Sequence, residues 1–307
     1  MKNIKVPIIM LVLIILTVVF LEPITDKIVS ILDSNNKIVI QNSNEYKKDY
    51  NFKYLQQKEK YIPYSYQDLI NIYYSTLNNG WDSFTFYCPK EYKTCLEDVK
   101  KISEDSTLLT HINNFVHPFN NFLEVNVSYN QIGETTLKID KLYSKEEIIQ
   151  INLEVNKILK DLKLETIKDP QEKIIKVHDF LINNTKYDEN FENNTSIYKS
   201  NTAFGLLIQN YAICGGYADT MAIFLTELGF QNFKIASETH VWNAVLVNNE
   251  WLHLDLTWDD PIDENGKNYL THKYFLINNK TLKDEDGELT EHTFDDKIYL
   301  EFNEKIN

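Results

Sequence analysis

The chain has 307 residues, of which 43% are hydrophobic and 25% charged, a composition that suits one large or two smaller folded domains. Its formal net charge is −14, which excludes the basic surface that nonspecific nucleic-acid binding requires, so we expect no nucleic-acid partner. All 31 basic residues are lysine, which also excludes bidentate arginine clamps for phosphate or carboxylate groups.

The first 22 residues predict a membrane anchor. Lys2 and Lys5 precede an uncharged apolar run, Val6–Leu21, which as a helix would span about 24 Å, slightly short of a hydrocarbon core of about 30 Å. The run ends in Val-Val-Phe-Leu-Glu-Pro, without the small residues of a signal-peptidase site, which favours an uncleaved signal anchor over residues 1–22 rather than a cleaved signal peptide. Because the lysines precede the span, we expect a single-pass protein of the cell membrane whose body is extracellular.

Residues 23–165 predict a polar stalk followed by a small α+β region. Residues 23–60, the stalk, are rich in Asn, Lys and Gln and lack strong apolar periodicity. The region over 61–165 predicts helices at 64–80, 90–102 and 144–163, a strand at 82–88, and a hairpin whose strands flank Gln131–Glu134. His111 and His117 fall in a loop-like stretch, where surface or packing roles are favoured over chemistry.

Three cysteines, Cys88, Cys95 and Cys214, cannot all pair, so at least one is free. Cys88 and Cys95 are seven residues apart, which allows a local disulfide in an exported domain or two reduced, buried thiols. No cysteines or histidines cluster at the spacing of a zinc site, so we expect no metal.

Cys214 stands at the start of a predicted helix that ends near Gly229. The free N–H groups of a helix N-terminus stabilise a thiolate, which makes this cysteine a candidate nucleophile. Gly215 and Gly216 would leave room for an extended substrate and present backbone N–H groups to an oxyanion. The alternative is a buried structural thiol beside glycines that only permit close helix packing.

Two strands are predicted around residues 248–249. A two-residue turn there pairs Trp242 with Asp255 and places His240 diagonal to Asp255 on the same face, with Cα atoms about 7–8 Å apart. A three-residue turn would place the two side chains on opposite faces. In the first register, the carboxylate could orient the imidazole and stabilise its charged form.

Three motifs together resemble the bacterial transglutaminase-like superfamily. They are Cys-x-Gly-Tyr-Ala from Cys214, His-x-Trp-Asn from His240, and Asp-x-Thr-Trp-Asp from Asp255, within a similar stretch at about 178–278. The resemblance implies a papain-like α+β core, which we assign to 166–307, preceded by the small α+β region and the transmembrane helix.

The resemblance also implies a catalytic triad, with Cys214 as nucleophile, His240 as base and Asp255 as the orienting residue. Its reaction would be acyl transfer or hydrolysis at a peptide or carboxamide group through a thioester on the cysteine, without a cofactor. A peptide or protein is therefore the expected substrate. The alternative is a noncatalytic surface module that binds peptide or cell-wall polymer in the same cleft.

Several neighbouring residues are assigned supporting or structural roles. Tyr187 and Gln209 are candidates for the second oxyanion donor, and the acidic stretch 259–266 is expected to be a solvated loop rather than a calcium site. His253 is expected to be an exposed strand residue rather than a group that supports Asp255 from behind, and His178 a structural residue. The tryptophans are expected in the core and the pocket wall: Trp242 and Trp258.

Overall fold

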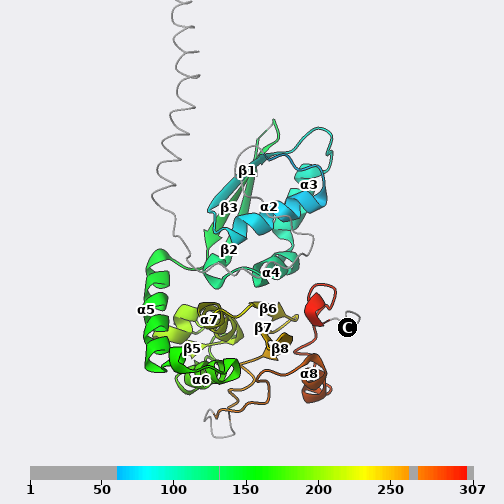
Figure 1. Ribbon diagram of the computed structural model, residues 1–307. Helices are drawn as coiled ribbons and strands as arrows, with labels where there is room; N and C mark the ends of the chain where they lie inside the picture. The colour runs from blue at the N-terminus through cyan, green and yellow to red at the C-terminus, as the bar shows by residue number, and fades with distance from the viewer. Residues whose placement is uncertain (1–60, 131, 263–268, 303–307) are drawn as a thin grey trace, which may run out of the picture. The chain divides into compact units, whose positions relative to one another are not determined.

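The computed structural model describes residues 61–130, 132–262 and 269–302 (Figure 1). All of them belong to a single compact unit. The predicted anchor and stalk, 1–22 and 23–60, lie outside the described residues. Within the described ranges, no helix combines the length and the hydropathy needed to cross a membrane.

Residues 61–143 form an antiparallel sheet with helices packed beside it (Figure 1). The strand order is β1-β3-β2, and Phe84 and Phe86 on β1 are fully buried while Thr85 and Tyr87 between and after them are exposed. This alternation is that of a strand with one face on a core. The elements are α2 (Tyr66–Asn78), β1 (Ser83–Tyr87), α3 (Cys95–Glu104), α4 (Ser106–Asn114), η1 (Pro118–Asn120), β2 (Phe122–Tyr129) and β3 (Glu134–Lys141).

The loop predicted around His111 is wrong, because residues 106–114 form α4. Asp105 caps this helix, accepting a hydrogen bond from the N–H of Leu108 at 2.9 Å. An N-cap aspartate before an apolar run is a local signal that the sequence does carry. His111 lies on the helix with Nδ1 3.0 Å from the Tyr299 hydroxyl, and His117 is buried in the turn after it.

Cys88 and Cys95 form a disulfide, which decides between the two alternatives left open by their spacing. The bond joins the end of β1 to the first residue of α3, with the two Cα atoms 5.7 Å apart. It leaves Cys214 as the free cysteine of the chain.

Residues 144–302 build the second part from helices and a short antiparallel sheet of order β6-β7-β8. The predicted helix at 144–163 is confirmed as α5, which opens with a capping box of Ser144 and Glu147, and Asp169 caps a further helix that opens with Pro170. The helix α7 packs against β6 and β7. The elements are α5 (Lys145–Asp161), η2 (Leu164–Thr166), α6 (Pro170–Asn183), β4 (Lys186–Tyr187), η3 (Gly205–Gln209), β5 (Tyr211–Ala212), α7 (Cys214–Glu227), β6 (Asn232–Ala236), β7 (Val241–Val247), β8 (Glu250–Leu254), α8 (Asn279–Asp286) and η4 (Leu300–Phe302).

A buried carboxylate on α7 connects the two parts. Asp219 accepts hydrogen bonds from the side chains of Asn121 and Tyr143, the latter at 2.7 Å, and pairs with Lys234 at 2.5 Å. A buried charge is tolerated where a counter-ion and hydrogen bonds replace its water. These contacts cross the predicted boundary between 61–165 and 166–307, and the boundary itself stays a prediction.

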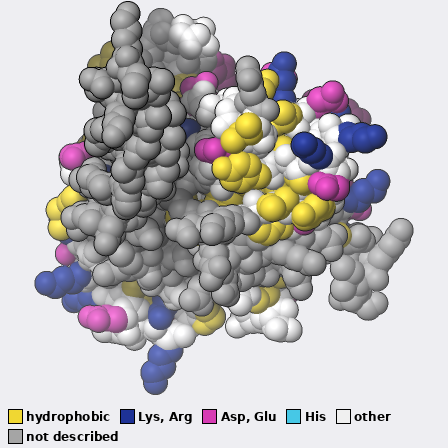
Figure 2. Space-filling model, turned by 90° about the horizontal axis from the view of Figure 1, so that it is seen from above, with side chains coloured by type: hydrophobic (Ala, Val, Ile, Leu, Met, Phe, Trp, Pro, Cys, Tyr) yellow, Lys and Arg dark blue, Asp and Glu magenta, His cyan; other side chains and the backbone are white. Residues whose placement is uncertain are grey.

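The described surface exposes scattered large apolar side chains, such as Leu123, Tyr129 and Leu153. On the face seen in Figure 2, apolar side chains gather among lysines and carboxylates. Such mixed surfaces are ordinary for soluble domains.

Candidate active site

Cys214 is the first residue of α7 and is half-buried. The short strand β5 leads into it, and the N–H of Ile213 donates to the carbonyl of Ser200 at 2.9 Å, which fixes the entry of the chain. The first N–H groups of a helix have no carbonyl partner within it. The thiol therefore stands where a helix N-terminus favours negative charge.

Close packing accounts for the glycine at position 216. A Cβ at this position would lie 2.3 Å from the carbonyl oxygen of Ser200, and one at Gly215 would lie 3.2 Å from that of Asn201. The close-packing alternative is thus confirmed for Gly216, and room for a substrate stays a prediction.

The predicted hairpin register is confirmed. Val247 pairs with Glu250, and Asn248 and Asn249 between them have φ values of 51° and 67°, as a two-residue turn of this hand requires. The strand pairing runs to Asn243 and Leu254. His240 lies just before β7 and Asp255 just after β8, so the pairing brings them together. Nε2 of His240 lies 2.5 Å from Oδ2 of Asp255.

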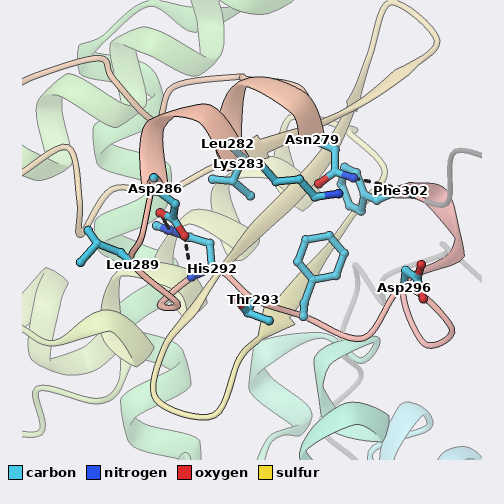
Figure 3. A pocket seen from close by; sticks show the side chains of 11 residues that line it. Asn279, Leu282, Lys283, Asp286, Leu289, His292, Thr293, Asp296 and Phe302 are labelled. Atoms are coloured by element: carbon cyan, nitrogen blue, oxygen red, sulfur yellow. Dashed lines mark hydrogen bonds and ion pairs between the residues drawn. The ribbon is translucent and has the colours of Figure 1, made fainter.

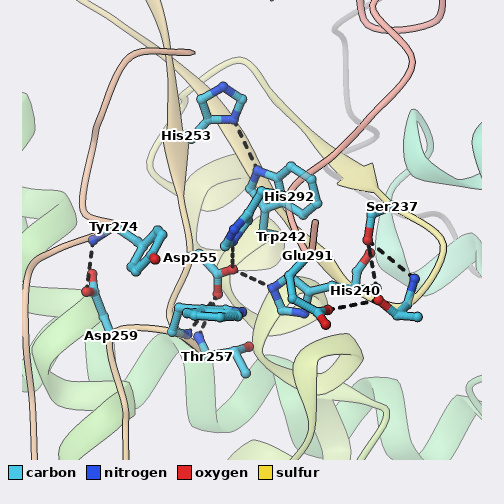
Figure 4. A network of polar contacts seen from close by, with 12 residues as sticks. Ser237, His240, Trp242, His253, Asp255, Thr257, Asp259, Tyr274, Glu291 and His292 are labelled. Carbon is cyan, nitrogen blue, oxygen red and sulfur yellow. Dashed lines mark hydrogen bonds and ion pairs between the residues drawn. The ribbon is translucent and has the colours of Figure 1, made fainter. Parts of the chain in front are cut away.

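A tight turn fixes the backbone of His240. The Ser237 hydroxyl oxygen accepts hydrogen bonds from the N–H groups of Thr239 and His240, at 3.3 and 3.0 Å. The N–H of Ser237 in turn donates to the carbonyl of His240 at 2.9 Å. The imidazole of His240 therefore projects from a hydrogen-bonded loop between β6 and β7 (Figure 4).

The electrostatics of the pair favour a charged imidazole. Burial by itself lowers the pKa of His240, but the Asp255 carboxylate and hydrogen bonds to Asp255 and Cys214 outweigh it and raise the pKa to about 10. Burial by itself raises the pKa of Asp255, but the charges and hydrogen bonds of His240 and His292 hold it well below its usual range. The structure therefore brings all three predicted residues, Cys214, His240 and Asp255, into one site.

The site contains a fourth group, His292, that the sequence did not reveal. Its Nε2 lies 2.9 Å from Oδ2 of Asp255 (Figure 4), and its Nδ1 lies 2.6 Å from Oδ1 of Asp286 (Figure 3). This histidine belongs to no recognised motif and follows the stretch of resemblance. Only its place in the fold identifies it.

Aromatic rings enclose His240. Trp242 stacks on it at 5.7 Å between ring centroids, and Trp258 stands edge-on at 6.4 Å, which agrees with the predicted core and wall roles. The indole N–H of Trp242 donates to Nδ1 of His253 at 3.1 Å. His253 is buried, so the prediction of an exposed strand residue was wrong; burial, with the charge of His292, lowers its pKa to about 3.

Tyr187 is close enough to Cys214 to feel its charge, and the side-chain oxygen of Gln209 is already hydrogen-bonded. Burial, followed by the charge of Cys214, raises the pKa of Tyr187 to about 12, so its hydroxyl keeps its proton near neutral pH. Oε1 of Gln209 accepts from the backbone N–H of Lys199 at 2.8 Å. A pocket of about 610 Å³ is lined by Tyr187, Tyr211 and eleven further residues from the end of α6, β4 and the loop after it, and the segment from Asp260 to Leu270.

The acidic stretch at 259–266 is only partly described, and its described aspartates are buried. Asp259 accepts hydrogen bonds from the hydroxyl of Thr271 and the N–H of Tyr274, both at 2.9 Å, and Asp260 accepts from the Tyr217 hydroxyl at 2.5 Å. The expectation of a solvated loop was therefore wrong for these two residues. Residues 263–268 lie outside the description.

Among the residues that the structure describes, two clusters of side chains have the composition of metal ligands. They are His178, Asp179 and His272, and His240, Asp255 and His292, and in each cluster one ligand atom per residue lies within 4.8 Å of the others. The closest approaches are hydrogen bonds between imidazole and carboxylate, at 2.5–2.9 Å. His178 is buried between Asp179 and Asp259, in keeping with its predicted structural role.

Residues 160–256 match the family model of the transglutaminase-like superfamily. A solved structure titled "Crystal structure of a TGase" is similar at 16% identity and a TM-score of 0.34, over 44% of this chain and 44% of that one. The match thus spans less than half the length of that structure. No curated protein matches the chain. The family match assigns a transglutaminase-like core to the segment that contains the first two motifs and the start of the third, at Asp255.

Proposed function

We propose that this chain, which carries a transglutaminase-like core, is a cysteine-dependent enzyme that transfers or hydrolyses acyl groups at peptide or carboxamide bonds. One observation carries the proposal: the buried contact of 2.5 Å between His240 and Asp255 beside a thiol at a helix N-terminus. A thiol, an imidazole and a group that orients the imidazole form the usual assembly of an activated cysteine.

In the proposed reaction, His240 takes the proton of the Cys214 thiol, and the sulfur attacks the carbonyl carbon and forms a C–S bond while the carbonyl π electrons move to oxygen. The C–N bond then breaks, and His240 transfers a proton to the departing nitrogen, which leaves a thioester. Water or an amine next attacks the thioester while His240 accepts its proton, and the thiol is regenerated. Asp255 holds the imidazole in place and stabilises its charge in both steps.

The negative oxygen of the tetrahedral intermediate needs hydrogen-bond donors. The backbone N–H of Cys214 is one candidate, as in other enzymes with a nucleophile at a helix start. We propose the hydroxyl of Tyr187 as the second, because this side chain lies near the thiol and keeps its proton. Gln209 is the weaker candidate, because its side chain already binds the backbone of Lys199.

The pocket of about 610 Å³ beside Tyr187 is the proposed cleft for a peptide or protein substrate. Its lining combines the rings of Tyr187, Tyr211 and Tyr269 with polar side chains such as those of Asn183 and Asn190, which suits a chain with amide groups.

The test uses Cys214 alkylation in the full-length, nonreduced protein. The disulfide protects the other two cysteines, so iodoacetamide reports on this thiol alone. We expect alkylation at pH 6 to be at least about tenfold faster than in the urea-unfolded chain, because the thiolate is the reactive form. The Cys214→Ala variant is the blank. Equal rates in the folded and unfolded protein would contradict the proposal.

A second measurement identifies the reaction. Amide-containing peptides are incubated with and without a primary amine, and ammonia release, cleavage and amine incorporation are followed by mass spectrometry. Activity in the wild type that is absent in Cys214→Ala supports the enzyme. Peptide binding that is equal in both proteins, without turnover, would instead support the noncatalytic binding module.

We also propose that the described unit lies outside the cell, tethered by residues 1–22. Disulfides form and persist in oxidising compartments such as the cell exterior, so the Cys88–Cys95 bond supports this location. Intact cells treated with a membrane-impermeant biotin reagent should label the protein. Labelling only after lysis would contradict the location.

A further inference from the structure

The catalytic carboxylate has a second imidazole behind it. Oδ2 of Asp255 accepts from Nε2 of His240 at 2.5 Å and from Nε2 of His292 at 2.9 Å. Oδ1 accepts from the backbone N–H groups of Thr257 and Trp258, at 2.8 and 3.2 Å. Both oxygens are thus held by two donors each, which leaves the carboxylate no other orientation.

His292 faces a carboxylate on each side. Its Nδ1 is 2.6 Å from Oδ1 of Asp286, the last residue of α8, and Oδ2 of Asp286 accepts from the backbone N–H of His292 at 3.1 Å. Because carboxylates accept, each ring nitrogen is placed to donate. From Asp286 to His240, acids and imidazoles therefore alternate.

Packing prevents the His292 ring from turning away. The indole of Trp242 stands edge-on to it at 4.8 Å between ring centroids, and the ring of Tyr274 stacks on it at 5.1 Å. The neighbouring Glu291 accepts a hydrogen bond from the Thr239 hydroxyl at 2.8 Å, beside His240. The segment around residue 292 is thus tied to the loop that carries the catalytic base.

We propose that His292, held by Asp286, is a positioning residue that fixes the Asp255 carboxylate in its ionised form against His240. The inference rests on the proposed function, because it assigns a task within the same site. A buried carboxylate that accepts several hydrogen bonds keeps its charge to a lower pH than one that accepts few. Outer hydrogen-bond partners of this kind are also known to orient the ligands and bases that they contact.

The ionisable groups that face His292 come from several elements. They are Asp286 from α8, Asp255 and His253 from β8 and its end, His240 from the loop before β7, and Tyr274 from the segment before α8. Lys283 lines the same pocket as His292. The two carboxylates are in hydrogen-bond contact, so they dominate the field on the ring.

His292 also lines a pocket of about 430 Å³ (Figure 3). Asp286, Lys283 and Phe294 line it together with this histidine. Removing the imidazole would therefore leave a hole that connects to the pocket. Free imidazole, which is much smaller than the pocket, could enter there and restore the missing donor.

The experiment measures the rate of Cys214 alkylation by iodoacetamide from pH 4 to pH 9 in the full-length protein. We expect His292→Ala to lower the rate at pH 6 by about 10- to 100-fold, the range for loss of an outer partner. In this variant, the fall of the alkylation rate at acidic pH should begin at a higher pH, because Asp255 then takes up a proton more readily. His292→Gln, which keeps one amide donor, should fall between this variant and the wild type, and 50 mM imidazole should restore part of the His292→Ala rate.

His117→Ala is the matched control, because His117 is also buried but lies in the first part of the fold. This variant should lose stability and keep the wild-type pH profile. If His292→Ala does not fold, His292→Gln and Asp286→Asn decide, since both change the hydrogen bonding with little change in volume. Wild-type profiles in the folded His292 and Asp286 variants would overturn the inference alone. A wild-type thiol with the reactivity of the unfolded chain would instead overturn the proposed function.

Discussion

Two histidines in this protein are each buried between two carboxylates. His178 lies 2.9 Å from Asp179 and 3.2 Å from Asp259, and His292 lies 2.6 Å from Asp286 and 2.9 Å from Asp255. Both imidazoles are fully enclosed. The local chemistry is the same.

The difference lies in what the inner carboxylate contacts next. Asp259 uses its other oxygen to hold Thr271 and the backbone of Tyr274, so the His178 bridge fastens α6 to the loop after β8. Asp255 instead shares an oxygen with His240. A buried acid–imidazole bridge therefore has no fixed role, and its neighbours determine whether it stabilises the fold or serves chemistry.

The largest expected effect separates the two inner carboxylates. Asp255→Asn should lower turnover by about 10⁴-fold, as loss of the orienting acid does in a serine-protease triad, because the amide no longer stabilises the charged imidazole. Asp259→Asn should leave the kcat of the folded protein within a few-fold of wild type. Similar turnover losses in both variants, measured on the same peptide substrate, would remove the distinction between the bridges.

The second prediction concerns the structural bridge. His178→Ala leaves two carboxylates without their common partner, and breaking a buried pair in this way costs about 3–5 kcal/mol of unfolding free energy. Urea denaturation measures the loss. His272→Ala, at a partly exposed ring that also contacts Asp179, should change stability by only about 0.5 kcal/mol. An equal loss of unfolding free energy in both variants would show that the buried ring of His178 stabilises the fold no more than the exposed ring of His272.

The third prediction is the pH dependence of stability. The pKa of His240 is raised to about 10, so its contribution is complete below its unfolded pKa, about 6.5, and declines as the pH rises towards 10. The pKa of Asp255 is lowered, so its contribution is present above about 3.9 and is lost at more acidic pH. Urea unfolding should therefore show a decline from pH 6.5 to 9.5 that is smaller in His240→Gln. Parallel curves for the two proteins would contradict the raised pKa.

The smallest effect serves as a reference far from both bridges. The Cys88–Cys95 disulfide closes a short loop and so restricts the unfolded chain. Its reduction should lower the free energy of unfolding by about 2.5 kcal/mol. The Cys88→Ser, Cys95→Ser double variant, used so that no reductant is present, should keep the wild-type alkylation rate of Cys214. A slower rate would mean that the first part of the fold controls the site.

Local rules account for what the sequence predicted well. The capping box at Ser144 and the two-residue turn at 248–249 depend on neighbours within a few residues, and strand parity then carried the register to His240 and Asp255. The motifs added Cys214. The transglutaminase-like core was predicted from these same residues.

Distant contacts account for what it missed. His253 was expected to be exposed, but its backbone exchanges hydrogen bonds with Ile277 and its ring stacks on Phe302 at 4.0 Å, so later segments cover it. Gly216 is required by the carbonyl of Ser200, which approaches from a preceding loop. His292 reaches the site from a stretch without periodicity. Strand alternation and motif spacing contain no information on such approaches.

The position of His292 bears on where the smallest working unit of this protein ends. The family match stops at residue 256, immediately after Asp255, so the matched segment contains the whole triad. A fragment cut there would nevertheless leave the back of that carboxylate open to water, without His292, Asp286 or the covering ring of Tyr274. In modular terms, the proposed catalytic unit extends beyond the family match by at least 36 residues, to His292, counted from residue 256.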